Sequence, residues 1–216
     1  MPTTLKIDFV SDVSCPWCAI GLTALLQAID RVKDEVTVYL RCQPFELNPR
    51  MAPGGQDITE HLTDKYGSTP EQQAQIRDMI RQRGEAVGFV FNPDGRGRIY
   101  NTFNAHRLLH WAGVEYPAQQ IALKMALLVA CHRDQQAMDQ TDTLLQAVQL
   151  AGLDVAHAQA ILAGDEFVDE VREAETYYTS RGIHSVPAVI LNDRQLISGG
   201  QAVEVYERAL RELAQA

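Results

Sequence analysis

The sequence predicts a mixed α/β fold in which a βαβ unit and an αββα unit are separated by a large all-helical insertion. Two observations carry this prediction. Segments with the pattern of strands lie near the two ends of the 216-residue chain, and most of the sequence between them has helical spacing. The composition agrees, because 46% hydrophobic and 22% charged residues are typical of a soluble globular protein with a buried core.

The N-terminal part predicts the βαβ unit. Leu5–Val10 alternates apolar and polar residues and is rich in strand formers, so we expect a strand there. A helix is expected from Pro16 to about Ile29, where apolar residues recur at helical spacing. A second strand is expected at Val36–Cys42. Two strands joined by a helix imply a parallel pair with a right-handed crossover.

A block of helices is expected next, interrupted by a turn-rich segment over residues 89–98 that contains Asn92-Pro93-Asp94-Gly95. Short connections containing Gly, Asp or Pro separate the helices. The expected helices run over Asp57–Tyr66, Glu71–Val87, Thr102–Trp111, Ala118–Cys131, Thr141–Ala151 and Val155–Ala163.

The C-terminal part predicts the αββα unit. A long helix is expected over residues 165–182, because it has an acidic start and a glycine stop. The strands Ala188–Leu191 and Gln195–Ser198 form a predicted hairpin, followed by a helix over Val203–Leu213. Without the helical block, this order is that of a four-stranded thioredoxin-type sheet. We therefore predict a discontinuous thioredoxin-like domain, residues 1–56 and 165–216, and a helical insertion domain, residues 57–164.

The pair Cys15 and Cys18 stands where the first strand gives way to the first helix. Cys15 is expected at the N-cap with Pro16 at the first helical position, so its sulfur faces unpaired backbone N–H groups that stabilise a thiolate. Cys18 lies less than one turn away and can close a disulfide. We expect an exposed Cys15 of lowered pKa to be the nucleophile and Cys18 to resolve the mixed disulfide. The Trp17 indole offers a substrate an apolar contact.

A zinc site is the competing interpretation of the pair. A structural zinc ion needs four ligands, yet Cys42 and Cys131 stand alone and no histidine pair has zinc-finger spacing from the motif. His106 and His110 are four residues apart on one predicted helix, a spacing that is also common by chance. Redox chemistry is therefore the better interpretation, no metal is predicted, and Cys42 and Cys131 are expected to be core thiols.

A second motif is Val186-Pro187 directly before the penultimate strand. Proline is common at the first residue of a strand, and the spacing alone leaves a cis or trans bond open. Beside a Cys-x-x-Cys helix, a cis Val186–Pro187 bond facing the cysteines would position the backbone for hydrogen bonds to a bound chain.

Together these residues resemble a known family. The segment Phe9-Val10-Ser11-Asp12-Val13-Ser14-Cys15-Pro16-Trp17-Cys18-Ala19-Ile20-Gly21 is similar to the active-site signature of the DsbA-like thioredoxin family, and more narrowly of its cytoplasmic FrnE-type branch. Phe45–Pro49, Asn101–Leu108 and Val186-Pro187 agree with it. The resemblance implies a thioredoxin fold with a helical insertion, a redox-active Cys15–Cys18 pair and a cis Pro187. The substrate-binding residues are then Val186, Pro187, Pro16 and Trp17.

Two related groups leave an alternative open. The 2-hydroxychromene-2-carboxylate isomerases and kappa-class glutathione transferases share Asp-x-x-Ser-Pro at this loop, and Cys15 stands where they have serine. In those relatives the helical block lines the substrate cleft, which makes His106 a candidate substrate contact; an ordinary core or surface histidine is the alternative. Asp12 is a candidate for tuning the pKa of Cys15, or a loop residue that caps local N–H groups.

The predicted function is thus a thiol–disulfide oxidoreductase acting on disulfide- or thiol-containing proteins or small molecules. No cofactor beyond the redox-active disulfide is predicted. Glutathione is a candidate co-substrate. Glutathione or the thioredoxin system is the candidate partner that recycles the cysteine pair. A glutathione-dependent isomerase or transferase of a small aromatic or polyketide-like molecule is the first alternative. A non-catalytic chaperone or binding module is the second. The oligomeric state is left open.

The formal net charge is −9, from 19 Lys and Arg against 28 Asp and Glu. Residues 134–175 account for it, because they hold ten carboxylates against the single cation Arg172. Nucleic acid and anionic membranes attract clustered Lys and Arg, so neither is an expected partner. No apolar run approaches the ~20 residues that span a bilayer. Residues Met1–Asp12 have no pattern of an export signal, so we expect a cytoplasmic location.

Overall fold

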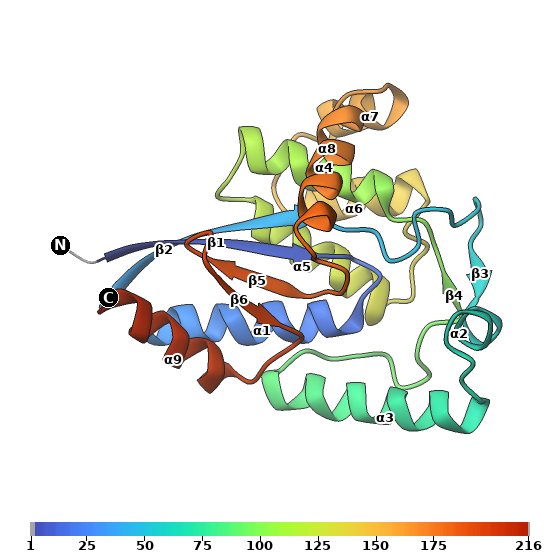
Figure 1. Ribbon diagram of the computed structural model, residues 1–216. Helices are drawn as coiled ribbons and strands as arrows, with labels where there is room; N and C mark the ends of the chain where they lie inside the picture. The colour runs from blue at the N-terminus through green and yellow to red at the C-terminus, as the bar shows by residue number, and fades with distance from the viewer. Residues whose placement is uncertain (1–2, 216) are drawn as a thin grey trace.

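The computed structural model describes residues 3–215 and places a four-stranded mixed sheet at the centre of the molecule (Figure 1). The strand order is β2-β1-β5-β6. β1 (Thr3–Ser11) pairs in parallel with β2 (Val36–Pro44), in a register that sets Phe9 opposite Cys42. β5 (Ala188–Leu191) is antiparallel to β1 and to β6 (Gln195–Ser198). The thioredoxin-like fold predicted from the element order is confirmed.

The alternation along β1 divides its side chains between the two faces of the sheet. Leu5, Ile7 and Phe9 belong to the core on the face covered by α1 (Pro16–Arg31) and α9 (Val203–Ala214). Val10 faces the opposite way and packs with Phe45 and Tyr178. Because both faces are covered, Ile7, Phe9 and Val10 are completely buried.

Helices α4 (Phe103–Glu115) and α8 (Val168–Ser180) lie on the other side of the sheet from α1 and α9 (Figure 1). Both contact β2. The predicted helix over residues 165–182 is shorter at both ends. It begins after Phe167, which adopts φ 63°, and it ends before Arg181 and Gly182 turn the chain toward β5.

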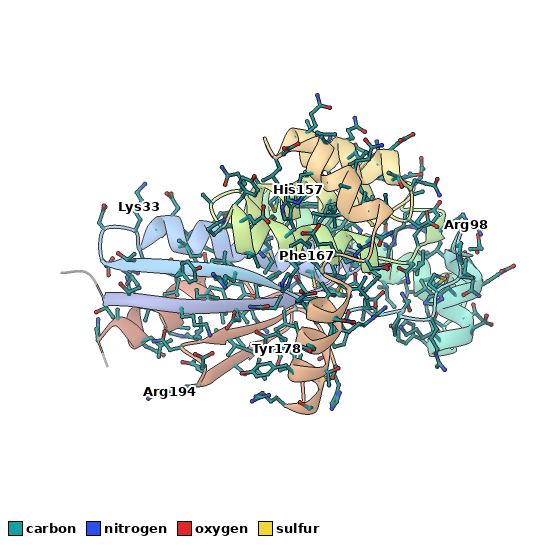
Figure 2. The ribbon with its side chains drawn as sticks, turned by 90° about the horizontal axis from the view of Figure 1, so that it is seen from above. Lys33, Arg98, His157, Phe167, Tyr178 and Arg194 are labelled. Atoms are coloured by element: carbon teal, nitrogen blue, oxygen red, sulfur yellow. The ribbon has the colours of Figure 1, made fainter. Side chains whose placement is uncertain are left out.

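The remaining helices are α2 (Ile58–Tyr66), α3 (Pro70–Val87), α5 (Gln120–His132), α6 (Thr141–Leu150) and α7 (Val155–Ala163). A second core forms among α4 to α7 around the buried Trp111, whose ring centroid lies 5.1 Å from that of His157, the α7 residue labelled in Figure 2. The core between the sheet, α1 and α9 also includes Phe89 and Leu128. The helical segment, residues 57–164, therefore shares buried side chains with the sheet.

The sequence analysis did not predict a second, two-stranded sheet within the helical segment. β3 (Gln56–Asp57) pairs with β4 (Arg98–Ile99), and two residues are too short to show a strand period. Helix α4 was expected to end at Trp111, whereas it continues to Glu115. The helix includes Gly113 near its end. A larger residue would crowd Gln120 there, because an added Cβ would lie 2.4 Å from Gln120 Nε2. Within residues 3–215, no helix combines the length and apolar character needed to cross a membrane.

Candidate active site

Cys15 and Cys18 lie where β1 ends and α1 begins. Cys15 is the N-cap, with extended backbone angles of φ −92° and ψ 115°, and Pro16 follows in the first helical turn, as predicted. The Cys18 N–H donates a 3.0 Å hydrogen bond to the Cys15 carbonyl oxygen, so both thiols come from one turn. Both are free thiols in this structure.

The expectation that Cys15 is exposed is wrong. Cys15 is only 4% exposed, and Cys18 is completely buried. The Cys15 thiol donates a 3.5 Å hydrogen bond to the carbonyl oxygen of Val186, so the loop before β5 covers the sulfur. Val186 is 171 positions further along the chain, and its contact with Cys15 agrees with the expectation that Val186-Pro187 faces the cysteines, whereas the burial of the sulfur was not predicted.

The two thiols have pKa shifts of opposite direction. The hydrogen bond from the Cys18 thiol is the largest cause that lowers the pKa of Cys15; burial opposes it, and the Cys18 and Trp17 N–H groups add to it. Burial raises the pKa of Cys18 well above its ordinary value, and the nearby Cys15 sulfur raises it further. The first thiol of the motif therefore loses its proton at a lower pH than the second, which donates a hydrogen bond to it.

The loop before β5 is fixed closely against α1. The Val186–Pro187 peptide bond is cis, and the Pro187 carbonyl accepts a 2.8 Å hydrogen bond from Gly199 N–H. A Cβ added at Gly21 of α1 would lie 3.1 Å from the Pro187 ring. Val186 and Pro187 therefore stand beside the cysteine turn. Of the other predicted substrate-binding residues, Pro16 and Trp17 are half-buried at the start of α1.

Asp12 organises the loop that leads into the cysteines. Its buried carboxylate accepts hydrogen bonds from Ser14 N–H at 3.0 Å, Leu47 N–H at 2.7 Å and the Thr102 hydroxyl at 2.8 Å. Burial opposes ionisation of Asp12, but the neighbouring His106 and the two N–H donors lower its pKa to about 2. Asp12 thus caps local N–H groups, and its negative charge also raises the pKa of Cys15. The capping interpretation of Asp12 is therefore confirmed, and its role in tuning the reactivity of Cys15 stays a prediction.

His106 lies behind Asp12 and not in an open cleft. It is 1% exposed, with its Nε2 atom 3.5 Å from an Asp12 carboxylate oxygen and without a hydrogen bond. It also lines a cavity of about 60 Å³ between β2 and α4, together with His110. The predicted substrate contact of His106 stays a prediction, because in this structure the side chain faces Asp12 and this small cavity.

Two residues of the helical segment that the sequence analysis missed hold the same loop. Arg96 donates to the Ser14 carbonyl at 2.6 Å and to the Ser14 hydroxyl at 3.1 Å. His132, whose pKa burial lowers to about 3, is neutral, and its Nε2 lies 2.9 Å from the Val13 carbonyl oxygen. Arg96 lies in the turn-rich segment and His132 ends α5, so neither position stands out in a single sequence.

The two other cysteines are buried, as predicted. Cys42 lies in β2, and burial raises its pKa to about 11. Cys131 lies in the core of the helical segment and accepts a 3.3 Å hydrogen bond from Arg96. In the described part of the chain, the cluster of potential metal ligands is Glu115, His157 and Glu166, which includes no cysteine.

Comparisons with known proteins agree with this geometry. The DSBA-like thioredoxin domain model matches residues 6–211. The crystal structure of a probable DsbA oxidoreductase from Streptomyces coelicolor is similar with a TM-score of 0.85 and 31% identity, over 98% of this chain and 90% of that chain.

Two more distant structures share the fold. A 2-hydroxychromene-2-carboxylate isomerase has a TM-score of 0.74 and 15% identity, over 97% of this chain and 96% of its own. The cytosolic disulfide reductase DsbM from Pseudomonas aeruginosa, in a structure with GSH, has a TM-score of 0.66 and 16% identity, over 98% and 100% of the two chains. The family match spans the sheet, the helical segment and the cysteine turn, and this chain belongs to the DSBA-like thioredoxin domain family.

Proposed function

We propose that this protein is a thiol–disulfide oxidoreductase in which Cys15 is the nucleophile and Cys18 the resolving cysteine. The observation that carries the proposal is the opposite direction of the two pKa shifts within one helical turn. Thiol–disulfide exchange by a cysteine pair needs one thiolate that attacks the substrate disulfide and a second thiol that later resolves the mixed disulfide. Membership of a family that includes oxidoreductases supports the same class of reaction.

The reaction proceeds in two exchanges. The Cys15 thiolate attacks one sulfur of a substrate disulfide, the substrate S–S bond breaks, and one substrate thiolate leaves. Cys18 then attacks the Cys15 sulfur, which closes the Cys15–Cys18 disulfide and releases the second substrate thiol. Two electrons pass from the pair to the substrate. The reverse sequence oxidises a substrate dithiol. If the mixed disulfide with Cys15 is instead resolved by another thiol of the same substrate, the substrate's disulfides are isomerised.

The substrate lies between the start of α1 and the loop before β5. The Val186 carbonyl oxygen that accepts the Cys15 thiol hydrogen bond loses that donor once Cys15 is a thiolate or a mixed disulfide. It is then free to accept an N–H from the substrate chain. The ring of Pro187, in this loop, packs against α1 near Gly21, and the half-buried Pro16 and Trp17 supply an apolar border.

The proposal extends to the compartment and the direction of electron flow. In a cytoplasm with a glutathione potential of about −220 to −320 mV, most such pairs are held reduced, which favours reduction or isomerisation of substrates. The FrnE-type signature supports this location. Glutathione or the thioredoxin system then reduces the Cys15–Cys18 disulfide after each turnover, and the active-site disulfide is the only redox group needed.

The test compares insulin reduction and scrambled-ribonuclease refolding for the wild type, Cys15→Ser and Cys18→Ser. We expect Cys15→Ser to abolish both activities and Cys18→Ser to stop at the mixed disulfide. Cys42→Ala is the matched control, because it removes a buried thiol of high pKa outside the motif, and it should keep its activity within about twofold.

Three outcomes separate the candidate functions. Activity that survives both substitutions contradicts the proposal. Glutathione-dependent turnover of a small aromatic substrate that needs Cys15 but not Cys18 identifies an isomerase or transferase instead. Suppression of client aggregation by a variant lacking both thiols, without any exchange activity in the wild type, identifies a binding module.

A further inference from the structure

Lys124, in the middle of α5, is completely buried, and among the residues that the structure describes its Nζ atom has no hydrogen-bond partner. A lysine is rarely fully buried unless it is paired, because removing an ammonium from water costs several kcal/mol. Among residues 3–215, no carboxylate forms an ion pair with it. The core therefore holds a lysine side chain that forms no ion pair with a described carboxylate.

Besides the Asp12 carboxylate, which like Lys124 acts on the pKa values of Cys131 and His132, the groups near Lys124 that can become anions are thiols. α5 packs against both α1 and β2, which bring Cys18 and Cys42 toward it, and Cys131 lies on α5 itself. The Lys124 charge acts on each of them in the direction that favours the thiolate. The other charged or titratable groups that face these thiols are Arg96, His132, Asp12, Cys15 and, from α9, Tyr206.

Of the three thiols near Lys124, Cys18 is the one that the proposed reaction requires as a thiolate. In the reduced protein, burial and the nearby Cys15 sulfur both keep Cys18 protonated. Once Cys15 is bound to substrate in a mixed disulfide, the Cys15 sulfur carries no negative charge and no longer accepts the hydrogen bond from the Cys18 thiol. Burial is then the remaining obstacle, and the Lys124 charge and the Asp12 N–H are the groups that oppose it.

We propose that Lys124 is a positioning residue of the resolving step, whose buried ammonium stabilises the Cys18 thiolate that attacks the mixed disulfide. This inference rests on the proposed oxidoreductase function. The Cys18 sulfur forms a bond to the Cys15 sulfur, the Cys15–substrate bond breaks, and its electron pair leaves with the substrate sulfur. The proton lost by Cys18 ends on the departing substrate sulfur. The Lys124 side chain therefore affects the reaction only after the first exchange has formed the mixed disulfide.

The test uses 5,5′-dithiobis(2-nitrobenzoate) at one equivalent with the full-length reduced protein. The first coloured thiolate reports attack by Cys15, and the second reports resolution by Cys18. Lys124→Met removes the charge at nearly constant length. We expect the first phase to be unchanged, and the second to slow about tenfold and to require a higher pH, as for a tenfold loss of thiolate. Lys124→Arg should restore most of the second rate.

The controls separate this role from a structural one. Leu128→Met changes another fully buried side chain one turn along α5 and should alter neither phase. If Lys124→Met does not fold, as judged by circular dichroism, Lys124→Gln makes the same test with a neutral polar side chain. Equal slowing of both phases, or a second phase within twofold of the wild type, overturns the role of Lys124. A first phase that persists in Cys15→Ser overturns the oxidoreductase function itself.

Discussion

The Cys15 thiol and the Val186 carbonyl oxygen are joined by a 3.5 Å hydrogen bond that connects the N-terminus of α1 to the loop before β5. The reactive sulfur is therefore held between two parts of the chain that are distant in sequence. This contact hides the thiol in the reduced protein and leaves one backbone acceptor available when the thiol loses its proton. The predictions below follow from this junction and from the residues that support it.

Cys15 should be the first cysteine alkylated by iodoacetamide as the pH rises. The lowered pKa of Cys15 places its thiolate at a lower pH, whereas burial raises the pKa values of Cys18, Cys42 and Cys131. Peptide mass spectrometry after brief alkylation between about pH 5 and 9 measures the order. Equal rates for Cys15 and Cys18 across this range would contradict the assignment of their roles.

Arg96→Ala should slow the first exchange by Cys15 and lower the free energy of unfolding by about 1–3 kcal/mol. The Ser14 carbonyl, directly before Cys15, then loses the 2.6 Å hydrogen bond from Arg96 inside the protein. Arg98→Ala is the matched control, because Arg98 binds the carbonyls of Gly54 and Gly55 instead. Urea unfolding and the rate of Cys15 alkylation measure both effects. If the two variants behave alike, Arg96 has no special link to the cysteine loop.

Acid should destabilise the fold through Asp12. Its pKa of about 2 in the folded protein is lower than that of an unfolded Asp, so the ionised carboxylate stabilises the fold above about pH 4. That contribution, roughly 2 kcal/mol, is lost as the pH falls toward 2. Urea unfolding of the wild type and Asp12→Asn at several pH values tests it. The difference between the two proteins should narrow as the pH falls, and a constant difference would be evidence against this role.

Gly200→Ala should destabilise the protein by about 1–3 kcal/mol, because the added Cβ would lie 2.8 Å from the Trp17 carbonyl oxygen in α1. Gly97→Ala offers a clean comparison, since no heavy atom lies within 4 Å of a Cβ added there. Thermal unfolding should show a lower midpoint for Gly200→Ala alone. A normal midpoint would mean that the loop before α9 can move away from α1.

Much of the fold could be predicted because it follows from local patterns. Strands β5 and β6 and helix α7 have the predicted bounds, since each is a short apolar segment with clear turn or cap residues at its ends. The N-cap position of Cys15 and the place of Pro16 were predicted for the same reason. The sheet β3–β4 was not, because two-residue strands show no period.

By itself, the sequence determined the element order, the thioredoxin-like sheet and the cysteine pair at the start of α1, because periodicity, caps and turn residues act over a few positions. The tertiary structure decided how those thiols are surrounded. It covers Cys15 with Val186, fixes the loop with Arg96, and buries Lys124 among three thiols. Burial and charge depend on residues that meet only after folding, and these two quantities set the pKa of each sulfur.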